Sequence, residues 1–293
     1  MSRISVRVPA TSANIGPGFD TLGIAFSLYN TFSFEETDGG LRFFGCDNKY
    51  KNENNLCYVA FKLVADAAEK KVGGLSISFS TEVPVARGLG SSATLIAGGA
   101  MGANELLSCG FSKQELLKIC LPLEGHADNL TPAFLGGFTA AMTDKNEIFI
   151  SELDISDKLR FFALIPDFET KTANARAVLP KEIPYKDAVS NISHIPLLIK
   201  ALKEGDSTIL PHALGDRLHE PYRQKLIYNF DAAKKAALDS GACAFFISGS
   251  GSTCISVATD DIRKNLENAV SSIPHSWRVI PLKVDREGAC ILK

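Results

Sequence analysis

The sequence predicts an α+β protein of two domains, and three observations carry this prediction. The chain has 293 residues, and a typical length of about 150 residues per domain suggests two domains. Strand-like and helix-like segments follow one another in a mixed order without an internal repeat. The composition changes around residues 154–158. We therefore expect an N-terminal domain at 1–157 and a C-terminal domain at 158–293, each long enough to bury a core.

The first half mixes strands and helices. Residues 3–8 alternate polar and apolar side chains, which predicts a strand, and residues 9–18 are rich in Ser, Thr, Asn, Gly and Pro, which predicts a loop. Residues 19–36 are strand-like in two pieces, and 41–45 form a short return strand. Further strands are expected at 75–80, 138–142 and 147–151, and helices from Asn54 or Asn55 to Ala67, at 93–107 and at 113–120.

The second half predicts a small ferredoxin-like α/β sandwich. Its strand-like segments are 160–165, 242–247, 253–258 and 276–282. Its helical segments are 172–178, 185–203, 230–240 and 260–271.

Composition and charge indicate a globular protein of the reducing cytosol. Hydrophobic residues make up 45% and charged residues 22%, which is ordinary for a soluble domain. The net charge of −2 gives no sign of a nucleic-acid partner, so any phosphate site must be local. The seven cysteines include no C-x-x-C pair, which disfavours zinc and disulfides. No signal peptide or membrane-spanning run is present, so we expect a cytoplasmic location and no membrane partner.

The most informative segment is a glycine–serine loop between a strand and a helix. Gly88 and Gly90 permit backbone torsions that other residues avoid, and free amides at the start of the next helix favour an anion. Ser91 and Ser92 can cap that helix. The alternative to a phosphate-binding loop is an ordinary turn followed by a serine-capped helix. The candidate phosphate-binding residues are Pro84, Val85, Ala86, Arg87, Gly88, Leu89, Gly90, Ser91, Ser92, Ala93 and Thr94.

Three further polar clusters lie where the chain turns. Residues 9–20 could place the side chains of Asn14 and Asp20 toward a ligand. Alternatively, the polar side chains of this segment could only form hydrogen bonds with its own backbone. A carboxylate within residues 124–129 would take Mg²⁺ if a triphosphate lay nearby, whereas His126 alone is more often a structural histidine than a proton carrier. Residues 248–252 form a glycine turn that could close on a phosphate or simply join two strands.

Residues 9–20, 88–93 and 249–252, in this order, resemble the three motifs of the GHMP kinase superfamily. Within it, the full first motif and Glu124-Gly125-His126-Ala127-Asp128-Asn129 resemble the homoserine kinases. Arg176-x-x-Leu179-Pro180 and Glu220-Pro221-Tyr222-Arg223 resemble the same family. The chain departs from the family at Ala127, where Pro is frequent, and at Ser252, where Pro usually follows Gly-Ser-Gly.

The resemblance implies ATP between two α+β domains, with residues 84–94 binding the nucleotide and the amides and hydroxyls of residues 88–92 cradling its phosphates. It further implies that Glu124 and one of the two serines, with Ser92 favoured over Ser91, hold Mg²⁺. Asn55 would contact the adenine, although its local sequence is more typical of a helix cap.

For the second substrate, the resemblance implies L-homoserine. Arg176 and Arg223 would clamp its carboxylate, although a surface ion pair is the default for an isolated arginine. Asp20 would hold the ammonium and Asn14 would orient the reacting hydroxyl, with Asn14 and Arg176 acting in the transfer step. The remaining wall would come from His126 and Asp128.

The implied reaction is phosphoryl transfer from ATP to the side-chain hydroxyl, as in threonine biosynthesis. Such transfers depend mainly on positioning and charge stabilisation, and no Asp–Lys pair is evident, so we expect no dedicated base. A mevalonate or sugar kinase of the same superfamily and a non-catalytic relative are the alternatives. We expect only small-molecule partners, and exposed strand edges are compatible with a homodimer.

Overall fold

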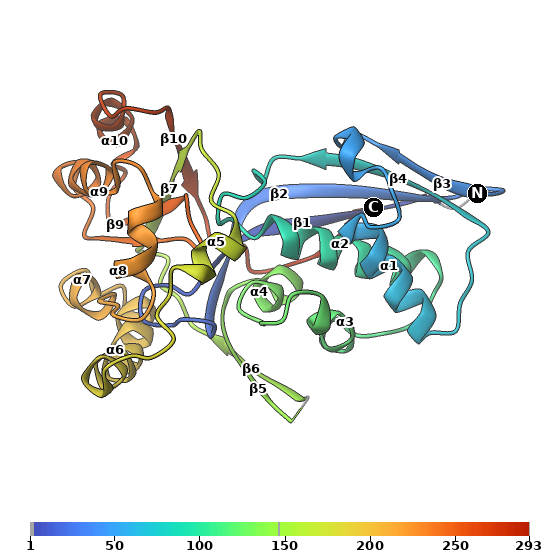
Figure 1. Cartoon of the computed structure of the whole chain (residues 1–293), viewed down its shortest axis with the longest axis horizontal. Helices are drawn as coiled ribbons and strands as arrows, with labels where there is room; N and C mark the ends of the chain where they lie inside the picture. Colours follow the sequence, from blue (N-terminus) through green and yellow to red (C-terminus); the bar gives the residue numbers. More distant parts are fainter. Residues whose placement is uncertain (1–2, 146, 293) are drawn as a thin grey trace.

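The computed structural model describes residues 3–145 and 147–292. It shows an α+β protein in two lobes, each built on its own sheet (Figure 1). Within these residues, no helix is both long and apolar enough to cross a membrane. The predicted fold class is confirmed, and the domain boundary at residue 157 stays a prediction.

The sheet of the first lobe has the order β11-β1-β2-β4-β3, with β5 also paired to β2 and β6 to β5. Most neighbours are antiparallel, but β3 runs parallel to β4, so the expected return strand at 41–45 does not fold back on the strand before it. Its strands are β1 (Arg3–Ala13), β2 (Leu22–Glu36), β3 (Gly40–Phe44), β4 (Gly74–Thr81), β5 (Phe138–Asp144), β6 (Glu147–Leu153) and β11 (Cys290–Leu292).

The predicted loop at 9–18 is wrong over its first five residues, which continue β1. The register against β2 shifts between Pro9 and Ala10, where a proline cannot donate a ladder hydrogen bond. β2 is correspondingly one long strand rather than two pieces. Small polar residues can extend a strand when a partner strand lies alongside, which composition alone did not reveal.

Four helices lie along one face of the first sheet: α1 (Leu56–Ala67), α2 (Ser91–Leu106), α3 (Lys113–Cys120) and α4 (Leu130–Leu135) (Figure 1). Helix α2 packs tightly on the sheet because it carries glycines. A Cβ added to Gly98 would lie 2.3 Å from the ring of Phe32, and one added to Gly102 would lie 2.4 Å from the ring of Phe34. These glycines therefore let the backbone of α2 approach the aromatic side chains of the sheet closely.

The second lobe is built on the antiparallel sheet β10-β7-β9-β8. Its strands are β7 (Arg160–Pro166), β8 (Ala244–Ile247), β9 (Cys254–Ala258) and β10 (Trp277–Leu282). Its helices are α5 (Thr172–Ala177), α6 (Tyr185–Glu204), α7 (Leu210–Ala213), α8 (Glu220–Arg223), α9 (Phe230–Asp239) and α10 (Arg263–Val270). Helices α7 and α8 were not predicted, because four residues are too few to show a helical period.

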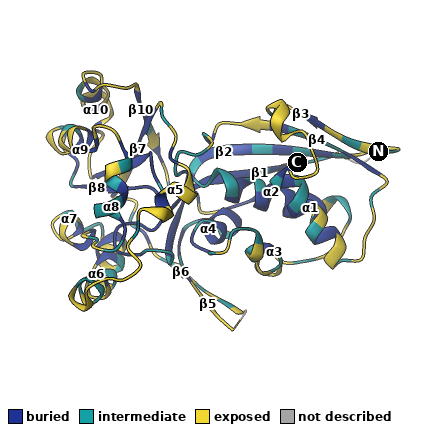
Figure 2. Ribbon diagram, viewed as in Figure 1, coloured by how far each residue is buried: buried dark blue, intermediate teal, exposed yellow. Residues whose placement is uncertain are grey.

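The two lobes share part of their apolar core. Phe26 of β2 and Phe161 of β7 are both fully or nearly fully buried, with ring centroids 5.2 Å apart. Strand β11 also returns to pair with β1. Figure 2 shows burial concentrated in the sheets, whereas the outer helices and the tip of the β5–β6 hairpin are largely exposed. A shared core holds the lobes in a fixed arrangement around the space between them.

Candidate active site

A cavity of about 730 Å³ lies between the two lobes. Its wall contains most of the candidate residues, although they come from segments far apart in the sequence. Those lining it are Asn14, Asp20, Asn55, Val85, Ala86, Arg87, Gly88, Gly90, Ser91, Ser92, Glu124, His126, Asp128, Arg176 and Arg223.

Four residues of the predicted phosphate loop do not line this cavity: Pro84, Leu89, Ala93 and Thr94. Leu89, Ala93 and Thr94 are buried beneath the loop. The Thr94 hydroxyl accepts a hydrogen bond from the Asn30 side chain and donates one to the Ser91 carbonyl. These side chains support the loop from within the protein rather than face a ligand.

The glycine–serine loop needs glycine at two positions. Gly88 and Gly90 have φ of 77° and 67°, and an added Cβ would lie 2.2 Å from the Ser248 carbonyl and 1.9 Å from the Thr11 hydroxyl, respectively. The predicted serine cap is wrong, because α2 begins at Ser91, Gly90 precedes it in a left-handed conformation, and no side chain caps this helix. Its first amides remain available for an anion.

Hydrogen bonds join the glycine–serine loop to the first polar cluster, at residues 9–20, and to the glycine turn that begins at Ser248. The Thr11 amide donates to the Leu89 carbonyl at 3.1 Å and the Thr253 amide to the Arg87 carbonyl at 3.0 Å. The Ser248 hydroxyl donates to the Gly88 carbonyl at 2.6 Å. The loop conformation therefore depends on segments from both lobes.

A carboxylate and a hydroxyl meet beside the loop. The Ser92 hydroxyl donates to the Glu124 carboxylate at 2.8 Å, and both residues line the cavity. Burial raises the pKa of Glu124. Two oxygen donors at the N-terminus of α2, where free amides favour an anion, form a set that suits Mg²⁺.

The side chain of Asn14 fixes the loop between β1 and β2. It is 3% exposed, accepts from the Asp20 amide at 3.0 Å and donates to the Gly249 carbonyl at 2.9 Å. Asn14 thus links the first predicted motif to the third and holds Asp20 at the cavity wall.

Two arginines reach the cavity from the second lobe. Arg176 of α5 forms a two-point ion pair with Asp20, and this hydrogen-bonded contact raises the pKa of Arg176. Arg223 of α8 is buried and donates to the carbonyls of Ala175 and Gly249 at 3.3 and 2.9 Å. Burial and then the neighbouring Arg176 lower the pKa of Arg223.

Arg223 has no ion-pair partner among the carboxylates of residues 3–145 and 147–292. A buried guanidinium without a counterion is costly. The cavity at this point is therefore prepared for an anion.

His126 and Asp128 form one hydrogen-bonded unit. The histidine Nδ1 lies 2.7 Å from the Asp128 carboxylate, and this hydrogen bond raises the pKa of His126. Asp128 also accepts from the Asn129 amide at 2.9 Å. The predicted structural role of His126 agrees with this geometry.

Asn55 is the N-cap of α1, which confirms the cap interpretation. Its Oδ1 accepts from the Cys57 amide at 3.0 Å, and its Nδ2 donates to the Tyr50 carbonyl at 2.9 Å. Contact between Asn55 and adenine stays a prediction.

Sequence reasoning missed several residues of the wall. Asn129 accepts from the Thr11 hydroxyl at 2.8 Å, and its place in the predicted cluster at 124–129 was a usable signal. Other missed wall residues lie outside the motifs singled out from the sequence, among them Asn30, Lys49, Tyr50, Phe79, Leu95 and Thr172.

Two protein families match this chain. The family described as GHMP kinases N terminal domain matches residues 55–137, and the family described as GHMP kinases C terminal matches residues 198–274.

Individual proteins match over nearly the full length. A homoserine kinase of Clostridium botulinum is 45% identical over 291 residues, which is 98% of each chain. A homoserine kinase of Clostridium beijerinckii is 42% identical over 295 residues, with 99% of each chain covered. The crystal structure of a homoserine kinase from Cytophaga hutchinsonii superposes with a TM-score of 0.90 at 28% identity, covering 100% of this chain and 98% of that one.

Proposed function

This chain belongs to the homoserine kinases of the GHMP kinase superfamily, and on that premise we propose that it transfers the γ-phosphoryl group of ATP to the side-chain hydroxyl of L-homoserine. The products are ADP and O-phospho-L-homoserine, an intermediate of threonine biosynthesis. We also propose a cytoplasmic location, and the exposed strand edges noted in the sequence are compatible with a homodimer.

The observation that carries this proposal is the unpaired guanidinium of Arg223. It is buried at the cavity wall beside Arg176. A substrate carboxylate would supply the missing counterion and accept hydrogen bonds from both arginines. Asp20, on the same wall, supplies the negative charge that an ammonium requires. An amino acid carries both groups, whereas mevalonate and sugars carry no ammonium.

The phosphate side of the cavity is the glycine–serine loop and the start of α2. The unpaired amides there and the helix dipole support binding of the ATP phosphates. Glu124 and Ser92 would hold Mg²⁺, which favours such oxygen ligands. When bound, the ion would neutralise charge on the phosphate oxygens. A nearby cation would also keep Glu124 ionised despite its burial.

In the proposed transfer, the homoserine hydroxyl oxygen bonds to the γ-phosphorus, the bond from that phosphorus to the bridging oxygen breaks, and ADP leaves. Asn14 orients the hydroxyl. Two cavity carboxylates, Asp20 and Asp128, are engaged by Arg176 and His126, respectively. We therefore propose that the hydroxyl proton leaves on the transferred phosphate, and that catalysis comes from positioning and charge stabilisation.

A substrate panel tests the proposal. ADP release by the purified protein is measured with Mg-ATP and L-homoserine, L-serine, L-threonine or mevalonate. The proposal predicts the highest kcat/KM with L-homoserine. Preference for mevalonate, or no turnover with any of the four, contradicts it.

A further inference from the structure

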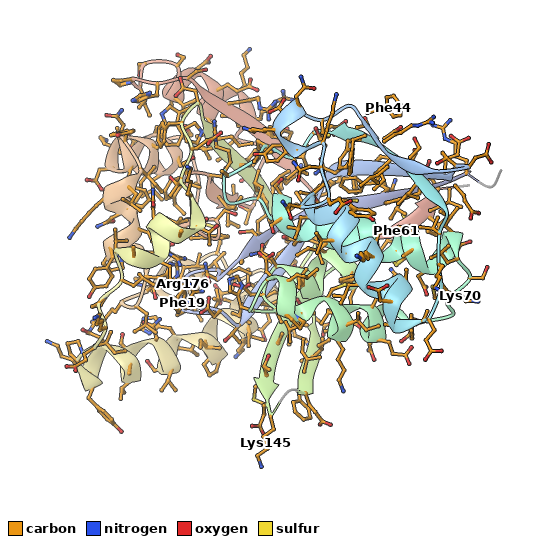
Figure 3. All side chains as sticks on the ribbon, turned by 45° about the vertical axis from the view of Figure 1, so that its right-hand side comes forward. Phe19, Phe44, Phe61, Lys70, Lys145 and Arg176 are labelled. Carbon is orange, nitrogen blue, oxygen red and sulfur yellow. The ribbon has the colours of Figure 1, made fainter. Side chains whose placement is uncertain are left out.

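One aromatic ring lies against both cavity arginines. The centroid of the Phe19 ring is 5.1 Å from Cζ of Arg223 and 5.4 Å from Cζ of Arg176. Figure 3 shows Phe19 and Arg176 together at the junction of the lobes. A guanidinium within about 6 Å of an aromatic ring is attracted by the ring's quadrupole. Phe19 is therefore in contact with the two groups proposed to bind the substrate carboxylate.

A buried histidine supports this ring. His219 stacks on Phe19 with centroids 5.2 Å apart and planes inclined by 22°. It is fully buried, and its Nε2 donates to the Gly16 carbonyl at 2.8 Å. Burial lowers the pKa of His219, which favours the neutral form of the ring beside the arginines.

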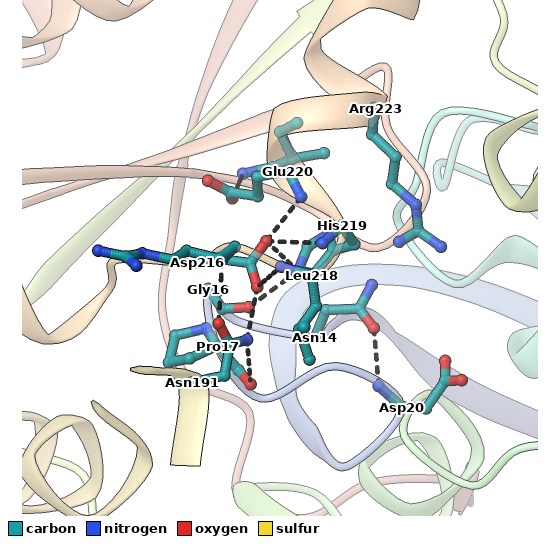
Figure 4. A network of polar contacts seen from close by, with 12 residues as sticks. Asn14, Gly16, Pro17, Asp20, Asn191, Asp216, Leu218, His219, Glu220 and Arg223 are labelled. Atoms are coloured by element: carbon teal, nitrogen blue, oxygen red, sulfur yellow. Dashed lines mark hydrogen bonds and ion pairs between the residues drawn. The ribbon is translucent and has the colours of Figure 1, made fainter. Parts of the chain in front are cut away.

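The position of His219 is itself fixed by a polar network (Figure 4). The buried Asp216 carboxylate accepts from the amides of Leu218, His219 and Glu220 at 3.0, 2.9 and 2.7 Å. It also accepts from the Asn191 side chain at 2.7 Å. This network secures the start of α8, the helix that carries Arg223.

We propose that Phe19, braced by His219, is the positioning residue that holds the guanidinium groups of Arg176 and Arg223 together for the substrate carboxylate. This inference rests on the proposed function. The two guanidinium groups repel each other when no anion lies between them. An aromatic ring attracts both without neutralising either, whereas a carboxylate in its place would compete with the substrate.

The test compares Phe19→Leu, which removes the ring, with Phe19→Tyr, which keeps it. The exposed Phe149 of β6, mutated to Leu, is the matched control. Loss of two cation–π contacts predicts a KM for L-homoserine about tenfold higher in Phe19→Leu. The KM for ATP should change by less than about twofold in every variant. Because Phe19→Tyr keeps the ring, its KM for homoserine should equal that of the wild type.

A second substrate separates positioning from general damage. The compound 3-aminopropan-1-ol is homoserine without its carboxylate. Phe19→Leu should lower kcat/KM about tenfold for homoserine while leaving that for the amino alcohol nearly unchanged. An equal loss on both substrates, or an unchanged KM for homoserine, overturns the inference.

Phe19→Met provides the same comparison if the leucine variant does not fold, as judged by thermal denaturation. Different results would contradict the proposed function and the role of Phe19. Absence of homoserine phosphorylation by the wild-type protein contradicts the proposed function itself. Wild-type turnover with an unshifted KM in the ring-deleted variant contradicts only the role of Phe19.

Discussion

Asp20 and Arg176, 156 positions apart in the sequence, form a two-point ion pair at the cavity wall, with N–O distances of 2.9 and 3.0 Å. These are the residues proposed to hold the ammonium and the carboxylate of the substrate. In the free protein they neutralise each other. A zwitterionic amino acid can replace this one ion pair with two: its ammonium pairs with Asp20, and its carboxylate contacts Arg176 and Arg223 together. The geometry therefore favours amino acids over substrates that carry a single charge.

Replacing Arg223 with Lys should weaken amino-acid binding selectively. Lysine keeps the charge but lacks the planar fork that binds a carboxylate at two points. Loss of one charge-assisted hydrogen bond costs about 1.5–3 kcal/mol, so the KM for L-homoserine should rise about 10- to 100-fold. Steady-state kinetics measures this, with the exposed Arg217 mutated to Lys as control. Equal homoserine KM values in both variants would argue against the clamp.

Replacing Asn14 with Ala should lower turnover while nucleotide binding survives. The amide is proposed to orient the reacting hydroxyl, and removal of one such group typically costs about 10²-fold or more in kcat. Calorimetric titration with an ATP analogue checks that the nucleotide site is intact. A variant with wild-type kcat contradicts the role given to Asn14.

Replacing Gly88 with Ala should impair ATP binding. The new Cβ would lie 2.2 Å from the Ser248 carbonyl at a φ of 77°, and such a conformation costs about 1–3 kcal/mol even without the clash. We expect the KM for ATP to rise about tenfold or more. Gly110→Ala is the control, because its φ is 82° but an added Cβ meets no atom of the described residues. Similar ATP affinity in the two variants would show that the loop geometry is unimportant.

Replacing Glu124 with Gln should raise the Mg²⁺ concentration needed for half-maximal activity. The amide retains an oxygen but loses the negative charge that a divalent cation prefers. We expect an increase of about tenfold, measured by magnesium titration at saturating ATP. Exposed Glu105, mutated to Gln, should behave as the wild type. An unchanged magnesium requirement would assign the metal to other residues.

Glu220 makes stability depend on pH. Burial raises its pKa to about 8, from an ordinary value of 4.5. The folded protein thus keeps a proton that the unfolded chain loses, and the free energy of unfolding falls as pH rises from about 4.5 to 8. In Glu220→Gln the side chain at this position carries no charge at any pH. The free energy of unfolding of the variant should therefore exceed that of the wild type by a few kcal/mol at pH 8, and the two values should be similar near pH 5. Urea unfolding at both pH values measures this; a parallel pH response in both proteins would be contrary to the expectation.

Much of the fold could be predicted because local signals agreed with tertiary structure. Ser112 forms the capping box with Glu115 that starts α3, and Asn55 caps α1 where its sequence suggested. The extension of β1 through Ala13 could not be predicted, because it depends on pairing with β2. Likewise, the parallel pairing of β3 with β4 is a long-range choice that no local pattern encodes.

The candidate site was predictable where short motifs carry chemistry. The glycine–serine loop lies beside Glu124, as the motifs implied. The support of Arg223 by Phe19 and His219 could not be read from the chain, since 200 positions separate these two aromatic residues and no sequence period relates them. Such contacts follow from packing of the two lobes rather than from local sequence.

The most direct test of the account is ³¹P NMR of a reaction that contains the purified protein, Mg-ATP and L-homoserine. The account predicts a phosphomonoester signal of O-phospho-L-homoserine that grows in equal amount with ADP. Accumulation of inorganic phosphate in place of that signal, or intact ATP after prolonged incubation, would contradict phosphoryl transfer to the homoserine hydroxyl.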